Sequence, residues 1–293
     1  MEFLISVSVL GTTYALLAAG IVVVYKASRV VNFAHGELAI VGAYGFWSAG
    51  LWAAATPASP LSLLVPIAMT AGISVLFGVA IYLALMRRLL GQPTFVAAMV
   101  TIGIAIILKA AIVIVWNARS VGINIGRQTL MTFEQGGRLT FVDTVTLISG
   151  VIFFALLFVF FHHTRLGRQF RGAAENPLLA SQRQVNVNLI LAIAWGTAVF
   201  SASLAGVLFG SRSMLSPQSP IIGLSGLTAA LVGGLDSLRG AAIGGLLVAL
   251  ATYVTARLIS PALADAVPFA LLLIVMCWRP WGIFGTPEEL NRV

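Results

Sequence analysis

The sequence predicts an all-α polytopic membrane protein with about eight or nine transmembrane segments, some of them half-helices. Of its 293 residues, 59% are hydrophobic and only 9% are charged, against about 25% charged residues in a typical soluble domain. A water-soluble fold could not cover so much apolar surface with so few charges. The net charge of +8 does not indicate a nucleic-acid partner, because the basic residues separate apolar runs instead of gathering on one polar face.

The apolar runs follow one another along the chain, and most have the length of about 20 residues that crosses a bilayer. We place them at about 5–25, 31–54, 62–86, 94–116, 144–163, 188–210, 221–238, 240–258 and 262–278. All belong to one transmembrane domain covering residues 1–293. The first run has neither a basic region before it nor a clear cleavage site, so we expect it to be retained. The long polar stretch 117–143 can carry structure of its own.

Basic residues predict the orientation, because Lys and Arg are enriched in cytoplasmic loops. If the loop at about 164–188 is cytoplasmic, alternation of the segments places eleven basic residues inside and five outside. This bias predicts an N-terminus outside and a C-terminus inside. Lys109 remains within a span, where it can extend toward the outer interface or line a substrate path.

The loop at about 164–188 contains the signals of a short helix. Asn176 can cap the first free N–H groups, and Pro177 suits the first helical position. The helix would present an apolar ridge that includes Leu178 and Val185. The charged residues of the loop are Arg165, Arg168, Arg171, Glu175 and Arg183. A basic helix with an apolar ridge predicts a docking surface for another protein; the alternative is a loop that only sets topology.

A second polar group lies between the first two apolar runs, in the sequence KASRVVNFAHGELAIVG. It contains Lys26, Arg29, Asn32, His35 and Glu37. Polar groups near membrane depth are costly unless they face protein or water, and Gly36 would allow close approach of a neighbour. The bend is therefore a candidate for the translocation path or for packing beside it. The alternative is an interfacial turn in which Glu37 pairs with Lys26 or Arg29.

A glycine-rich segment near the C-terminus, GGLDSLRGAAIGG, is the third candidate. Gly240 and Gly244 have the small-xxx-small spacing that lets membrane helices pack closely. With Gly233 and Gly234, they are candidates for packing near the path. Asp236 and Arg239 are three residues apart and could pair across one helical turn.

Signals of catalysis and metal binding are missing from the sequence. A phosphate-binding loop needs Gly-Lys-Ser/Thr, but the only lysines, Lys26 and Lys109, follow Tyr25 and Leu108. His162 and His163 are adjacent and have no third metal ligand at hand. We therefore expect a transport subunit without an ATPase site, catalytic residue, metal or cofactor of its own.

Four ordered motifs resemble one family: NFAHGELAIVGAY (32–44), AAENPLLASQRQVNVN (173–188), GGLDSLRGAAIGG (233–245) and RPWGIFG (279–285). The chain resembles the membrane permease subunits of ABC importers for branched-chain amino acids. The resemblance implies a multi-pass protein of the bacterial inner membrane that works with a second permease, two cytoplasmic ATPases that hydrolyse ATP and a periplasmic substrate-binding protein. It also implies that residues 173–188 contact the ATPase. The chain departs from the family pattern at Gln184-Val185 and at Arg239.

Other functions fit the same sequence. Similar permeases carry urea, short amides or other amino acids. A self-sufficient secondary transporter or channel would need coupling carboxylates near the bilayer midplane, and the candidates here are Glu37 and Asp236. A scaffold subunit that transports nothing is a third alternative.

Overall fold

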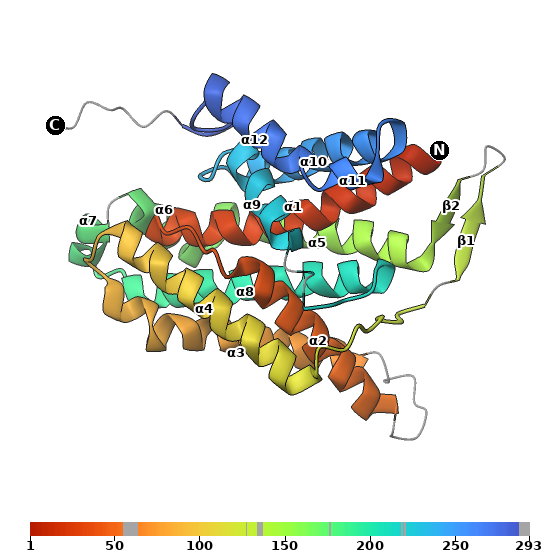
Figure 1. Cartoon of the computed structure of the whole chain (residues 1–293). Helices are drawn as coiled ribbons and strands as arrows, with labels where there is room; N and C mark the ends of the chain where they lie inside the picture. Colours follow the sequence, from red (N-terminus) through yellow and green to blue (C-terminus); the bar gives the residue numbers. More distant parts are fainter. Residues whose placement is uncertain are drawn as a thin grey trace.

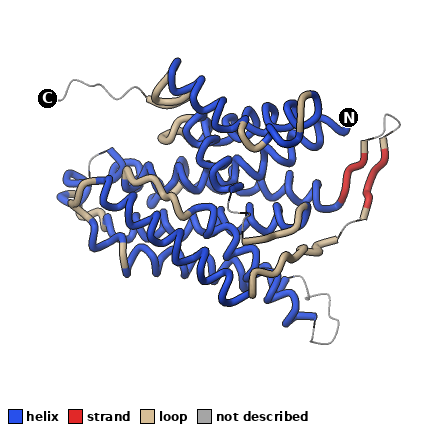
Figure 2. Tube along the Cα trace, in the orientation of Figure 1, coloured by secondary structure: helices blue, strands red, loops and turns tan. Residues whose placement is uncertain are grey.

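The computed structural model describes residues 1–54, 64–126, 128–133, 137–175, 177–217, 219 and 221–286, and most of these are helical (Figure 2). For residues 53, 54, 177, 178 and 221 the description covers the backbone alone. The helices are α1 (Glu2–Ser28), α2 (His35–Ala54), α3 (Leu64–Ala84), η1 (Met86–Leu89), α4 (Thr94–Trp116), α5 (Phe141–His163), α6 (Arg165–Glu175), α7 (Pro177–Gln182), α8 (Val187–Arg212), α9 (Ile221–Gly233), α10 (Leu238–Leu258), α11 (Pro261–Ala264) and α12 (Val267–Trp278).

Helices α1 and α8 form the centre of the bundle (Figure 1). In their most apolar stretches, 83% and 78% of the residues are buried. Small residues such as Ala18 and Ala19 of α1 and Ala198 and Ala202 of α8 have no exposed surface. Small side chains let helices approach closely, and such packing holds membrane helices together because lipid tails are as apolar as the side chains.

Helices α3, α4 and α5 lie outside this centre and turn apolar side chains away from the protein. Only 22–28% of their apolar stretches is buried. Leu76, Ile107, Ile114 and Val151 are each between 68% and 76% exposed. Water would disfavour such a surface, whereas a bilayer solvates it. This arrangement confirms the predicted class, an all-α polytopic membrane protein.

Six of the described helices are long and apolar enough to cross a membrane: α1, α3 extended through η1, α4, α5, α8 and α10. Helix α2 has 20 residues, whereas α9 and α12 have 13 and 12. The last two are shorter than the ~20 residues of a full span, as expected for half-helices. The predicted run at 262–278 is divided because Ser260 caps α11 at Pro261, and Pro268 then lies in the first turn of α12.

The described residues of the stretch 117–143 include two paired strands and an isolated bridge between Val121 and Leu215. Strand β1 (Thr129–Thr132) pairs antiparallel with β2 (Arg138–Thr140). Thr140 then begins α5 with a capping box formed with Asp143. Asp143 also lies 3.4 Å from Arg212 at the end of α8. The hairpin is thus anchored at the end of the bundle opposite α6 and α7 (Figure 1).

Candidate functional site

The loop at 164–188 contains two helices, α6 and α7, where the sequence predicted one (Figure 1). Helix α7 begins at the predicted residue, Pro177. The predicted cap, Asn176, lies outside the described residues, and so do the side chains of Pro177 and Leu178. The predicted roles of these three side chains remain predictions.

Helix α6 is fixed to the end of α5 by an aromatic contact. Phe170 is 1% exposed, and its ring meets that of Phe161 edge to face at a centroid distance of 4.9 Å. Gly167 packs against the carbonyl of Phe160 so closely that any side chain would collide there. Arg168, Arg171 and Glu175 lie on the exposed face. The helix therefore presents a charged surface while its apolar face holds it to the bundle.

The short helix α7 exposes a different apolar residue from those predicted. Leu179 is 56% exposed, and Arg183 is exposed just beyond the helix. Val185 is half-buried and packs against the core of its own chain, and its amide donates a hydrogen bond of 3.1 Å to the carbonyl of Ala180. Leu179 is thus an exposed apolar residue of α7 that the predicted ridge of Leu178 and Val185 did not include.

The polar bend before α2 is packed inside the protein. Asn32 and His35 are each 1% exposed, and the Asn32 carbonyl oxygen accepts a hydrogen bond from the amide of Ala34 at 3.0 Å. The backbone of Gly36 lies against Gly223 of α9, where a Cβ would come within 2.2 Å. Glu37 is half-buried. An ordinary interfacial turn would leave these groups in water, so burial favours the packing interpretation.

Lys26 and Asp236 make contacts that the sequence did not predict. The Lys26 ammonium donates a hydrogen bond to the backbone carbonyl of Asp236 at 2.9 Å. The Asp236 carboxylate lies before the start of α10 and accepts hydrogen bonds from the amide and hydroxyl of Thr286. These contacts join the first and last parts of the chain at the end that carries α6.

The glycine-rich segment forms the crossing of α9 and α10. A Cβ at Gly240 would lie 2.2 Å from the carbonyl oxygen of Gly233, and one at Gly244 would lie 2.1 Å from that of Ala229. Gly234, with φ of 108°, occupies the turn after α9. The structure therefore brings Gly233, Gly240 and Gly244 together at a close helix contact, whereas Gly234 packs against Gly282 and Gly285. Their nearness to a translocation path remains a prediction.

A cavity of about 440 Å³ lies between α2, α3 and α8, with Trp116 of α4 closing one side. Its wall is mostly apolar and contains a few hydroxyl groups. Ser74 donates a hydrogen bond to Ser203 at 2.7 Å, and the Trp116 indole donates one to Ser48 at 2.8 Å. Thr70 also lines the cavity. Thr70 and Ser74 are four positions apart, a helical spacing that was visible in the sequence.

The cavity and the predicted path residues occupy different places. The described lining does not include the bend residues Asn32, His35, Gly36 and Glu37 or the glycine-rich segment, although Leu38 and Val41 of the same helix do line it. Sequence reasoning selected unusual polar groups between apolar runs. It overlooked single hydroxyl residues within apolar runs, such as Thr70 and Ser74.

Comparisons with known proteins identify the chain's relatives. A profile described as "Branched-chain amino acid transport system / permease component" matches residues 3–276. The chain is 30% identical over 296 residues to BraD of Pseudomonas aeruginosa, a high-affinity branched-chain amino acid transport system permease protein, covering 98% of this chain and 96% of BraD. LivH of Salmonella typhimurium is 30% identical, covering 95% and 93% of the two chains.

A weaker likeness extends to a sugar permease. The ribose import permease protein RbsC of Escherichia coli is 34% identical over 120 residues, which covers 39% of this chain and 36% of RbsC. No solved structure matches the chain. Because the profile and the near full-length relatives agree, the chain belongs to the family of permease components of branched-chain amino acid transport systems.

Proposed function

We propose that this chain translocates branched-chain amino acids across a bacterial inner membrane as the permease subunit of an ATP-driven importer. The family match over residues 3–276, with relatives that align over almost their whole length, carries this proposal. The helical, lipid-compatible fold supports it. In this role the chain forms the translocation path for the substrate, while partner subunits bind and hydrolyse ATP.

The proposed partners are two cytoplasmic ATPases, a second permease subunit, identical or homologous, and a periplasmic substrate-binding protein. Helices α6 and α7 would receive the ATPase. Their exposed face combines Leu179 with Arg168, Arg171 and Arg183. Buried apolar anchors hold such contacts together, whereas charges at the rim mainly change the rate of encounter. Because Phe170 fixes α6 to α5, a movement of the ATPase against this surface would be transmitted to the membrane helices.

The cavity between α2, α3 and α8 suits the substrate class. An aliphatic side chain can lie against its apolar wall, and the hydroxyls of Thr70, Ser74 and Ser203 can orient the polar end of an amino acid. One rim is formed by Trp52 and Ile73, which are 61% and 59% exposed. A second permease packed against this rim would complete the enclosure.

Reconstitution tests the proposal. The chain is co-expressed with its genomic neighbours that encode ATPases, a second permease and a binding protein, and the purified complex is placed in proteoliposomes. Uptake of radiolabelled leucine should require ATP, the binding protein and a catalytically competent ATPase. A complex carrying an inactive ATPase is the matched control.

Two results would contradict the proposal. Leucine uptake that follows an ion gradient and ignores ATP would indicate a secondary transporter. ATP-dependent uptake of urea, a short amide or another amino acid, without leucine uptake, would mean that the chain belongs to an ATP-driven importer but that the proposed substrate is wrong.

A further inference from the structure

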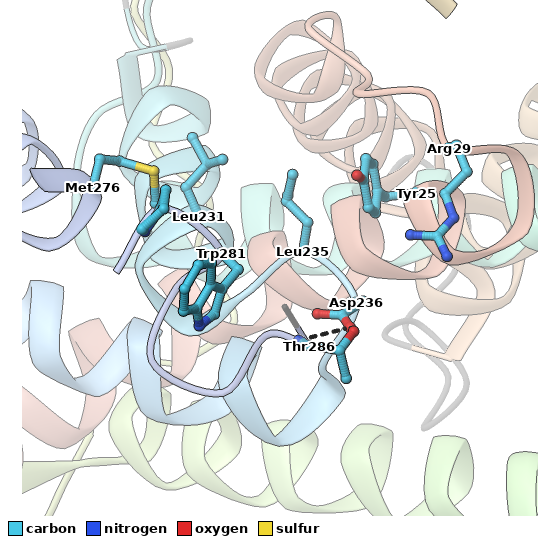
Figure 3. Close-up of a pocket in the computed structure, with 9 residues that line it drawn as sticks. Tyr25, Arg29, Leu231, Leu235, Asp236, Met276, Trp281 and Thr286 are labelled. Atoms are coloured by element: carbon cyan, nitrogen blue, oxygen red, sulfur yellow. Dashed lines mark hydrogen bonds between the residues drawn. The ribbon is translucent and has the colours of Figure 1, made fainter. Parts of the chain in front are cut away.

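A pocket of about 270 Å³ lies at the end of α1, between α9, α12 and the segment that follows α12 (Figure 3). Its polar groups already serve the fold. Thr286 donates two hydrogen bonds to the Asp236 carboxylate, and the Lys26 ammonium donates one to the Asp236 carbonyl. The Arg29 guanidinium lies over the ring of Tyr25. These contacts hold the two ends of the chain together and leave substrate recognition to the larger cavity between α2, α3 and α8.

Helix α2 lines that larger cavity with one of its faces. Leu38, Val41, Gly45, Ser48 and Trp52 all belong to the lining. Each is three or four positions from the next, so they follow one another along the same side of the helix. Gly45 is the middle residue of this row. A side chain at position 45 would therefore project from the centre of the wall that α2 contributes.

Two glycines of α2 line the cavity, and their surroundings differ. A Cβ at Gly42 would lie 2.1 Å from the hydroxyl oxygen of Ser203 on α8. Gly42 therefore allows the two helices to approach closely, which is the usual role of small residues in membrane helices. A Cβ at Gly45 would meet no neighbouring atom of the described residues within 4 Å. The missing side chain at Gly45 thus adds room to the cavity and makes no close helix contact.

Room of this kind decides which aliphatic side chain can enter. The other walls of the cavity carry Ile73 and Phe77 of α3 and Val199 of α8. These side chains offer apolar contact, but they have no charge or hydrogen bond with which to tell one aliphatic group from another. Discrimination among aliphatic substrates then rests on size. In an apolar pocket, one methylene more or less changes the preference by about 10–200-fold.

We propose that Gly45 sets the size of the amino-acid side chain that this permease accepts. The bare helix surface at Gly45 receives the branched end of a leucine side chain, while the polar end of the amino acid lies toward the hydroxyls of Ser74 and Ser203, which share a hydrogen bond. A side chain at position 45 occupies the same space and excludes the larger substrate first. The substrate class in this inference rests on the proposed function.

Competition between two substrates of different size tests this role. Proteoliposomes that contain the full complex take up ³H-leucine and ¹⁴C-valine from one solution, which gives the ratio of kcat/KM for the two amino acids. Gly45→Ala adds one carbon to the wall, and leucine is one methylene longer than valine. The ratio of leucine to valine should therefore fall about tenfold, the lower end of the range for one methylene. Gly45→Val adds three carbons and should lower leucine uptake further.

Gly50→Ala is the matched control. Gly50 lies on the same helix, a Cβ there would also meet no described neighbour within 4 Å, and the described lining of the cavity does not include it. Its leucine-to-valine ratio should equal that of the unmodified complex, in which the binding protein is the same.

An unchanged ratio in Gly45→Ala and Gly45→Val, with assembly verified by gel filtration, would overturn the role of Gly45. An equal fall in Gly50→Ala would overturn it as well. If the unmodified complex takes up no leucine, the proposed function itself fails and this inference fails with it. Leucine uptake by the unmodified complex therefore separates failure of the proposed function from failure of the role of Gly45 alone.

Discussion

Replacing Phe170 with alanine should release α6 from the bundle without disturbing the membrane helices. The ring is 1% exposed and lies edge to face with Phe161 at 4.9 Å. Burial of a Phe side chain contributes about 1.5–3 kcal/mol by transfer alone, and the cavity left by truncation raises the loss to about 3–5 kcal/mol. Even the lower value of about 3 kcal/mol shifts the balance between docked and released α6 roughly a hundredfold.

Two measurements follow this release. Hydrogen exchange should become faster at the amides of α6 in Phe170→Ala and stay unchanged in α8. In proteoliposomes of the full complex, ATP hydrolysis per leucine transported should rise, because the ATPase would push on a helix that no longer moves α5. Phe158→Ala is the matched control, since this ring lies on α5, the helix that also carries Phe161, and is 51% exposed. Unchanged exchange and unchanged coupling in Phe170→Ala would refute the idea that this ring anchors α6.

The remaining predictions concern topology, packing and docking. In a Cys277→Ser background, single cysteines that replace Gln182 and Gln128 should react with a membrane-impermeant thiol reagent from opposite sides of the membrane. Labelling of both from the outside would overturn the predicted orientation. Gly244→Leu should reduce assembly, measured as the yield of folded protein after gel filtration, because a Cβ there already lies 2.1 Å from the Ala229 oxygen; normal yield and transport would disprove the close packing. Leu179→Asp should lower co-purification of the ATPase severalfold, and Arg183→Ala should lower it much less. Full co-purification in Leu179→Asp would mean that the loop only sets the topology.

Much of the fold could be predicted because its signals are local. The apolar runs gave the long helices to within a few residues, and Pro177 correctly marked the start of α7. Helix α6 was missed, because the loop was predicted to contain one helix, which begins at Pro177. Leu166, Phe170 and Ala173 nevertheless follow helical spacing, and two of them are buried. That spacing is the signal that would have found the helix.

The pockets could not be predicted, because they join residues that are far apart in the sequence. Lys26 and Asp236 are 210 positions apart and share a hydrogen bond. Ser74 and Ser203 are 129 positions apart and share another. Neither pairing has a periodic or compositional signal. The sequence alone identified the glycine-rich turn as unusual. It could not show that Lys26 donates a hydrogen bond to Asp236 in that turn.

The central place of α1 has a consequence for how the protein is made. Among the described helices this one leaves the ribosome first, yet its main contacts are with α10 and α8, and α10 begins about 210 residues after α1 ends. At a synthesis rate of about 5–20 residues per second, α1 waits roughly 10–40 s for its principal neighbour. During that interval its surface of small side chains faces lipid or a chaperone of the insertion machinery. Assembly of the bundle is therefore completed late, when α10 packs against a helix that was inserted well before it.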